Sequence, residues 1–201
     1  ATNAAVVDTF DVENITGSTG IDYIVGSSDD NTITAGSGAD YIVGGAGDDT
    51  ITGGDGIDTI AGGDGADTFD FSTVILAANA NNISDFDATN GGAIVDLLQI
   101  DAVTFTNFSA AGAAVTVVAN AAAAAIIVAN VAGSAADNVV VATAAQIGAL
   151  DFAAGNGTAA GAMLAVASDT GDILYDADGD FSLGTITIGS ITAAEAAVLA
   201  D

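Results

Sequence analysis

Apolar and polar residues recur with a period of nine between residues 17 and 70. Six units follow one another, and the eighth position of each is large and apolar: Ile24, Ile33, Ile42, Ile51, Ile60 and Phe69. The seventh to ninth positions predict a short strand whose middle side chain points inward. One apolar side chain per unit would then stack into a thin core, and two units would complete one coil of 18 residues.

The first six positions of each unit predict a tight loop that suits a hard cation. Their consensus is G-G-x-G-x-D. Glycine permits positive φ and lets carbonyl oxygens crowd toward one point, while the carboxylate adds a charged oxygen of the kind that calcium prefers. The sixth positions are Asp22, Asn31, Asp40, Asp49, Asp58 and Asp67. The predicted ligand set also holds Gly44, Gly53 and Gly62 at the first position and the acids Asp55 and Asp64 at the third.

Alternate loops are predicted to lie on the same side of the coil. One side carries loops 17–22, 35–40 and 53–58, and the other carries loops 26–31, 44–49 and 62–67. A cation between successive loops of one side would bridge coils that otherwise bring carboxylates together.

The full motif, G-G-x-G-x-D-x-U-x with U large and apolar, resembles the RTX (repeats in toxin) family of secreted bacterial proteins over residues 17–70. The resemblance implies a parallel β-roll that binds several calcium ions. It also implies type I secretion, in which the chain passes unfolded through a secretion channel and folds outside the cell.

The first three units depart from this motif. Three residues stand where glycine is expected: Ser18, Ser27 and Ala35. In addition, Asp29 replaces the fourth-position glycine and Asn31 replaces the acid. We therefore expect weaker sites in these units and the best sites in loops 53–58 and 62–67, which match the motif fully.

The charge of the chain strengthens the case for a metal. The sequence holds 27 acidic residues and no Lys, Arg or His, which makes its formal net charge −27. Repulsion on this scale disfavours a compact state, whereas divalent ions would both neutralise and fold the chain. Because the cell exterior is rich in calcium and the cytosol is not, we expect an extracellular or cell-surface location.

Missing residue types exclude most other functions. Without His, Cys or Lys there is no triad base, thiol nucleophile or Schiff-base lysine, so we do not expect an enzyme. Glycosidase-like chemistry by paired carboxylates stays formally open, but the acids follow the loop spacing and aromatic residues are scarce. Without Lys or Arg we expect neither nucleic-acid binding nor membrane insertion. The longest apolar stretch, 121–129, is shorter than a membrane span. Residues 1–16 contain no basic segment and no long apolar core, so we do not expect them to be a retained signal peptide; a signal peptide that is cleaved off stays an open alternative.

Segments on both sides of the repeats are predicted to close the roll. Residues 1–16 alternate in polarity around Phe10, Val12 and Ile15, which predicts one capping strand. The nine-residue frame ends after Phe69, and residues 71–101 resemble the C-terminal flank of RTX rolls. Asp85, Asp87 and Asp96 in this flank either complete a further calcium site or are solvated turn acids.

Residues 102–201 predict an Ala-rich β domain, so the fold class is all-β. The predicted strands are 115–119, 125–129, 139–142, 163–167, 173–175 and 185–188. A short helix capped by Thr192, with Glu195 three residues later, is predicted near the end. This end also resembles the C-terminal export region of RTX proteins.

Three acids at alternate positions, Asp176, Asp178 and Asp180, form a separate candidate site. Their spacing is similar to the start of an EF-hand loop, but Gly179 stands at the fourth position instead of the sixth and no Glu follows at the twelfth. The EF-hand is therefore rejected. A turn-based calcium site and an exposed acidic turn both stay open.

The outward positions of the strands differ between the two sides of the coil. They are Tyr23, Val25, Tyr41 and Val43 on one side, and Thr32, Thr34, Thr50 and Thr52 on the other. An apolar outer stripe predicts burial against the rest of the chain or against another copy.

Three functions compete. The first is a secreted structural protein that self-assembles into a surface layer, filament or matrix, with a cell-surface polysaccharide as a further candidate partner. The second is the calcium-dependent folding and export module of a larger secreted hydrolase or adhesin. The third is ice binding by the outward threonines, Thr32, Thr34, Thr50 and Thr52. Only two coils carry this Thr-x-Thr pattern, which is a small surface for binding ice.

Overall fold

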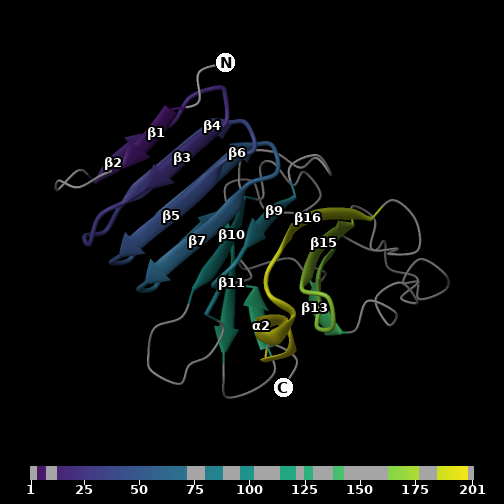
Figure 1. Ribbon diagram of the computed structural model, residues 1–201. Coiled ribbons are helices and arrows are strands. Elements are labelled where there is room, and N and C mark those ends of the chain that lie inside the picture. Colours follow the sequence, from purple (N-terminus) through teal and green to yellow (C-terminus); the bar gives the residue numbers. More distant parts are fainter. Residues whose placement is uncertain are drawn as a thin grey trace, which may run out of the picture.

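The computed structural model describes residues 4–7, 13–71, 80–87, 96–101, 114–120, 125–128, 138–142, 163–176 and 185–198. The strands of these segments form two sheets (Figure 1). In sheet order, the nine-stranded sheet contains β1 (Ala4–Val7), β3 (Asp22–Val25), β5 (Tyr41–Ala46), β7 (Thr59–Asp64), β9 (Asn81–Ile83), β16 (Ile186–Ser190), β15 (Asp172–Asp176), β14 (Met163–Ala167) and β13 (Asn138–Ala142). The seven-stranded sheet contains β12 (Ala125–Val128), β11 (Ala114–Asn120), β10 (Leu97–Asp101), β8 (Thr68–Asp70), β6 (Thr50–Asp55), β4 (Thr32–Ser37) and β2 (Asn14–Thr16).

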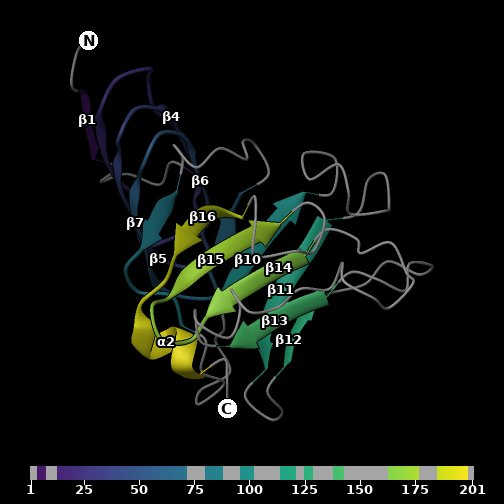
Figure 2. The same ribbon diagram turned by 90° about the vertical axis from the view of Figure 1, so that its right-hand side faces the viewer.

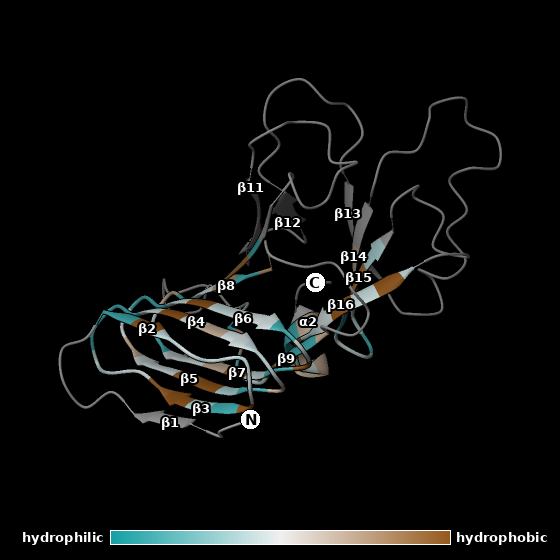
Figure 3. Ribbon diagram, turned by 90° about the horizontal axis from the view of Figure 1, so that it is seen from above, coloured by the Kyte–Doolittle hydropathy of each residue, from teal (hydrophilic) through white to brown (hydrophobic). Residues whose placement is uncertain are grey.

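Successive repeat units place their strands in opposite sheets. In the nine-stranded sheet β3 pairs with β5 in parallel, with Ile24 opposite Ile42, and in the seven-stranded sheet β4 pairs with β6, with Ile33 opposite Ile51. Figure 3 shows the result from above, with β2, β4 and β6 facing β3, β5 and β7 across the roll. The predicted all-β class and the parallel β-roll with 18-residue coils are confirmed.

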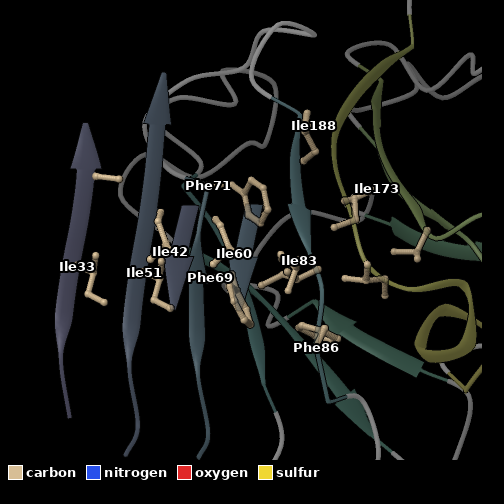
Figure 4. Packing of buried hydrophobic residues seen from close by; sticks show 14 of the residues in the cluster. Ile33, Ile42, Ile51, Ile60, Phe69, Phe71, Ile83, Phe86, Ile173 and Ile188 are labelled. Carbon is tan, nitrogen blue, oxygen red and sulfur yellow. The ribbon is translucent and has the colours of Figure 1, made fainter. Parts of the chain in front are cut away.

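The eighth positions form the core of the roll. All six are at most 2% exposed: Ile24, Ile33, Ile42, Ile51, Ile60 and Phe69. In Figure 4 Ile33, Ile51 and Phe69 project from one sheet toward Ile42 and Ile60 of the other. Burying one such side chain contributes about 1.5–3 kcal/mol. The roll contains only one of them per unit, so its core is thin.

Glycines allow successive coils to stack closely at the loops. Gly54 and Gly56 have φ values of 99° and 128°, a region that other residues rarely adopt. A Cβ atom on either residue would also collide with a backbone carbonyl oxygen of the coil before it, that of Gly36 or Gly38. These positions therefore require glycine for two independent reasons.

The segment before the repeats differs from its prediction. In place of one capping strand over 1–16 there are two strands, β1 and β2. β1 pairs with β3, with Ala4 opposite Asp22, and β2 pairs with β4, with Asn14 opposite Thr32. Both pairs keep the 18-residue register, so the coil continues without its glycine loops. Ile15 is buried, whereas Phe10 and Val12 lie outside the described residues.

The roll also continues beyond Phe69, where the sequence frame ends. β9 pairs with β7, with Ile60 opposite Ile83, and β10 pairs with β8, with Phe69 opposite Leu98. The register offset is 23 residues in the first pair and 29 in the second, because extra residues separate these strands. The apolar ladder is kept, since Ile83 and Leu98 are fully buried.

Within the described residues, the Ala-rich part of the chain extends the same two sheets. β16 pairs with β9 in parallel, and β11 pairs with β10 in the antiparallel sense. Figure 2 shows β13 to β16 continuing beside the strands of the roll. Every strand predicted after residue 102 is present to within one residue at its start and two residues at its end. β12 starts at the end of the alanine run, because β-branched residues follow it.

The predicted C-terminal helix is present as α2 (Ala193–Val198). The Glu195 backbone N–H donates to Thr192 Oγ1 at 3.3 Å, which confirms the predicted cap. In the part of the chain that the structure describes, no helix is long and apolar enough to cross a membrane.

Candidate metal centre

The sixth-position side chains form two hydrogen-bonded ladders along the roll. The Asp22 ladder consists of Asp22, Asp40, Asp58 and Asn81, and the Asn31 ladder consists of Asn31, Asp49, Asp67 and Asp96. At each step, Oδ1 of one residue accepts the backbone N–H of the ladder residue one coil earlier. The N···O distances are 2.7, 2.9 and 3.0 Å in the Asp22 ladder and 2.7, 2.9 and 2.9 Å in the Asn31 ladder.

The second carboxylate oxygen is left without a partner at four steps. Among the described residues, these buried and unpaired atoms are Oδ2 of Asp40, Asp49, Asp58 and Asp67. Each of these side chains is at most 2% exposed. A buried carboxylate oxygen that lacks a donor or a counter-charge strongly destabilises a fold. The loops therefore require a positive charge at these four atoms.

Burial also raises the pKa of these acids. The pKa rises to about 7 for Asp49 and to about 6 for Asp58 and for Asp67. Loss of water around the carboxylate is the main cause; the backbone hydrogen bond opposes it and neighbouring carboxylates add to it. The pKa of Asp40 is raised for the same reasons. In the absence of a cation, this environment disfavours the charged form.

The donor set fits calcium. Beside Gly44, the space that a Cβ atom would take is bounded by Asp49 Oδ2 and the carbonyl oxygen of Gly62. Beside Gly62, the same space is bounded by Asp67 Oδ2. Carboxylate and carbonyl oxygens around a glycine suit a hard cation, which prefers six to eight oxygen ligands. The sixth-position acids and these glycine loops would hold calcium, and its charge would neutralise the unpaired oxygens and join successive coils.

Side chains alone do not complete such a site. In the described ranges, no group of three or more His, Cys, Asp or Glu side chains is gathered closely enough to hold a metal ion. Each loop contributes one buried sixth-position side chain, which is an acid in every loop except 26–31, so backbone carbonyl oxygens must supply most of the ligands. Position-one glycines such as Gly53 belong to the site because they leave room for these oxygens: a Cβ there would meet Asp58 Oδ2.

The C-terminal flank caps loop 62–67. Asp85 accepts the backbone N–H of Gly62 at 2.9 Å and that of Gly63 at 3.0 Å. Asp96 accepts the N–H of Asp67 at 2.9 Å through Oδ1 and the N–H of Asp87 at 2.7 Å through Oδ2. Burial raises the pKa of Asp96 to about 7. Asp85 thus bonds the start of loop 62–67, and Asp96 bonds its end.

Sequence reasoning missed Asn81 as the last member of the Asp22 ladder. The available signal was a polar residue two positions before a large apolar one, as in N-N-I at 81–83 and D-L-L at 96–98. This spacing matches positions six and eight of the repeat.

Among the other predicted site residues, Asp64 lies near enough to Asp67 for its charge to help raise the pKa of that acid. Asp55 and Asp64 are exposed at the ends of β6 and β7, and their backbone carbonyl oxygens accept N–H groups of Gly38 and Gly47. Asp176 ends β15, whereas Asp178 and Asp180 lie outside the described residues.

Two ladder residues, Asp22 and Asn31, accept hydrogen bonds from their own loops. Asp22 Oδ2 accepts the backbone N–H of Ser18 at 2.6 Å, and Asn31 Oδ1 accepts that of Ser27 at 2.7 Å.

Comparison with known proteins identifies the repeats. The family model for the RTX calcium-binding nonapeptide repeat (4 copies) matches residues 16–51 and 43–72. No curated protein matches the chain. The predicted RTX resemblance is confirmed over this region. Such repeats bind calcium ions, several per repeat region, and are typical of secreted proteins.

Proposed function

Because this chain is an RTX-repeat protein whose repeats bind calcium, we propose that it is a secreted structural protein that folds outside the cell and assembles with copies of itself. The assembly is a surface layer, filament or matrix at the cell surface. No catalytic role is part of this proposal, since the sequence holds no His, Cys, Lys or Arg.

Folding outside the cell follows from charge. The chain has a net charge of −27, and folding buries four carboxylate oxygens without a partner. The folded form therefore requires bound cations at these oxygens, whereas in the unfolded form water solvates them. Any ion that binds the folded state and not the unfolded one shifts the equilibrium toward folding. Export in the unfolded state followed by folding in extracellular calcium fits this coupling.

The observation that carries self-assembly is an apolar outer surface on one side of the roll. Tyr23 and Tyr41 are 45% and 44% exposed, and their rings stack with centroids 5.0 Å apart at an angle of 3°. Ile21 and Ile57, both 57% exposed, occupy the fifth position of loops on this side. We call these four residues the Tyr/Ile face. The two tyrosines lie one coil apart and the two isoleucines lie two coils apart, and together they present an apolar surface that another copy can cover.

The opposite sheet offers a matched control. Thr32 and Thr50 hold the same seventh position in β4 and β6 that Tyr23 and Tyr41 hold in β3 and β5. An acid on either sheet adds the same charge and leaves the sixth-position ligands intact. A difference between the two double variants therefore reports on the Tyr/Ile face.

Light scattering and electron microscopy with and without calcium test the proposal. The wild-type protein should form polymers at millimolar calcium and none in excess EGTA. Tyr23→Asp/Tyr41→Asp should assemble poorly, whereas Thr32→Asp/Thr50→Asp should assemble like the wild type. A wild-type protein that folds in calcium but stays monomeric would refute self-assembly and favour the alternative, a calcium-dependent folding and export module of a larger secreted hydrolase or adhesin.

A further inference from the structure

The first loop of the Asp22 ladder is closed by a serine. Ser18 donates its backbone N–H to Asp22 Oδ2 at 2.6 Å and its hydroxyl to Asp22 Oδ1 at 3.1 Å. The same hydroxyl accepts the backbone N–H of Gly20 at 3.2 Å. Both carboxylate oxygens of a side chain that is only 1% exposed are thus hydrogen-bonded within their own loop.

The first loop of the Asn31 ladder repeats this arrangement. Ser27 donates its backbone N–H to Asn31 Oδ1 at 2.7 Å, and Asn31 Nδ2 donates to the Ser27 hydroxyl at 3.2 Å. The hydroxyl also accepts the backbone N–H of Asp29 at 3.1 Å. Here the buried side chain is a neutral amide, so it carries no charge for a cation to balance.

The four later loops have glycine where these two have serine. Their second positions are Gly36, Gly45, Gly54 and Gly63. In the described residues, the same four loops contain the four unpaired Oδ2 atoms, those of Asp40, Asp49, Asp58 and Asp67. The residue at the second position thus separates closed loops from loops that need a cation.

We propose that Ser18 and Ser27 close the first loop on each side of the roll in place of calcium, so that calcium is confined to the four loops from residue 35 to residue 67. A carboxylate oxygen that already accepts an N–H or O–H has one lone pair fewer for a cation, and the donor hydrogen repels a positive charge that approaches from its side. The serines therefore satisfy the buried sixth-position side chains and oppose metal binding by the same contacts.

The position of the two loops gives a physical reason for this device. These are the first loops of the roll on their two sides, and the coil before them, formed by β1 and β2, contains no glycine between residues 4 and 16. A buried polar side chain there still needs partners. A serine in the same loop provides them without a neighbouring loop. The inference rests on calcium binding by the repeats and is independent of self-assembly.

Equilibrium dialysis against calcium, followed by elemental analysis of the full chain, tests this assignment. Asp22→Asn keeps the size and one acceptor oxygen of the side chain, and it should leave the number of bound ions and the calcium midpoint of folding unchanged. Its matched counterpart Asp58→Asn, in the same ladder, should lose at least one bound ion. Loss of an ion in Asp22→Asn equal to that in Asp58→Asn would overturn the proposal.

A second pair of variants tests the hydroxyl itself. At saturating calcium, Ser18→Ala should lower the thermal midpoint of the protein, because a closure hydrogen bond is removed, and it should not lower the ion count, because that hydrogen bond opposes metal binding. Ser37→Ala, in the next loop of the same side, is the control and should have little effect on either quantity. An unaltered thermal midpoint in Ser18→Ala would show that the hydroxyl does not close the loop. If neither the wild-type protein nor any variant bound calcium at any concentration, calcium binding by the roll would itself be refuted. That result differs from equal ion losses in Asp22→Asn and Asp58→Asn.

Discussion

The roll and the strands that follow it share two sheets but are held together by different interactions. In the roll, one large apolar residue per unit is buried, and a buried polar or acidic side chain stands two positions before it. In β14 to β16, the buried side chains are apolar apart from a tyrosine, and they include Val166, Ile173 and Ile188. Among the described residues, every buried acid lies between Asp22 and Asp96.

This difference shows how a regular solenoid can manage with a thin core. Each loop from residue 35 to residue 67 repeats the same unfavourable carboxylate beside the same small apolar contribution, so the metal must supply the missing free energy loop by loop. The later strands form the antiparallel pairs β14–β15 and β15–β16, and β14 packs against α2; the described residues of these strands bury no acid that would need a metal. Calcium should therefore stabilise the roll and have little effect on the stability of β14 to β16.

Removal of calcium is expected to have the largest effect. In excess EGTA the backbone amides of residues 14–70 should lose protection from hydrogen exchange, because the four unpaired carboxylate oxygens become unbalanced negative charges. The amides of β14 to β16 should lose less protection. Hydrogen exchange read by mass spectrometry resolves the two regions. Equal protection of the roll with and without calcium would show that metal does not hold it together.

Truncation of a buried side chain is expected to have the second-largest effect and to distinguish the two regions. Ile51→Ala should destabilise the calcium-bound protein by about 2–5 kcal/mol and raise the calcium concentration needed for folding, because folding and metal binding are coupled in the roll. Ile173→Ala removes an equally buried residue from β15 and should lower the thermal midpoint with a much smaller change in the calcium midpoint. Circular dichroism during calcium titration and heating measures both. Equal shifts in calcium midpoint would show that the two regions fold as one unit.

Acid should partly replace calcium. The pKa of Asp49 is about 7 in the folded roll and those of Asp58 and Asp67 are about 6, against an ordinary value of 3.8. The folded state therefore binds more protons, and its stability falls as pH rises from about 4 through 7. In EGTA, the β signal in circular dichroism should be stronger at pH 5 than at pH 7.5. Asp49→Asn, which removes one of these groups, should reduce that difference. A calcium-free roll that is more stable at pH 7.5 would contradict the assignment.

The smallest expected difference lies within the roll. Asp67→Ala should raise the calcium midpoint of folding by about tenfold, which is close to 1.4 kcal/mol, because it removes an unpaired ligand oxygen. Asn31→Ala should raise it much less, since Asn31 is already bonded to Ser27. Both midpoints come from calcium titration followed by circular dichroism. Equal calcium midpoints for the two variants would contradict the prediction that loop 62–67 binds calcium more strongly than loop 26–31.

Sequence reasoning predicted the parts of this protein that repeat locally. A nine-residue period with an apolar eighth position is sufficient to define strands, loops and an inward face, because each unit meets an identical neighbour 18 residues away. The four acids with unpaired oxygens were all among the predicted ligands for this reason. The cap of α2 was also visible, since a helix cap involves residues only three positions apart.

Features that depend on variable loop lengths could not be obtained in this way. Asn81 and Asp96 extend the two ladders across offsets of 23 and 29 residues, and nothing in the local pattern specifies either number. The coil before residue 17 could not be predicted either, for a different reason. Its strands keep the register of the roll, but they lack the glycine loops that mark a repeat unit in the sequence.

The sequence by itself determined the roll, its two sides, its inward isoleucines and its need for calcium, because each of these follows from short-range spacing and from charge. Only the tertiary structure decided that β16 lies beside β9 and that β11 lies beside β10. It also decided that Ser18 and Ser27 satisfy the first ladder residues. Strand pairing between distant segments depends on which sheet edge is open when the chain returns, and a hydrogen bond depends on side-chain direction. Neither the open sheet edge nor the side-chain direction can be read from the period of a repeat.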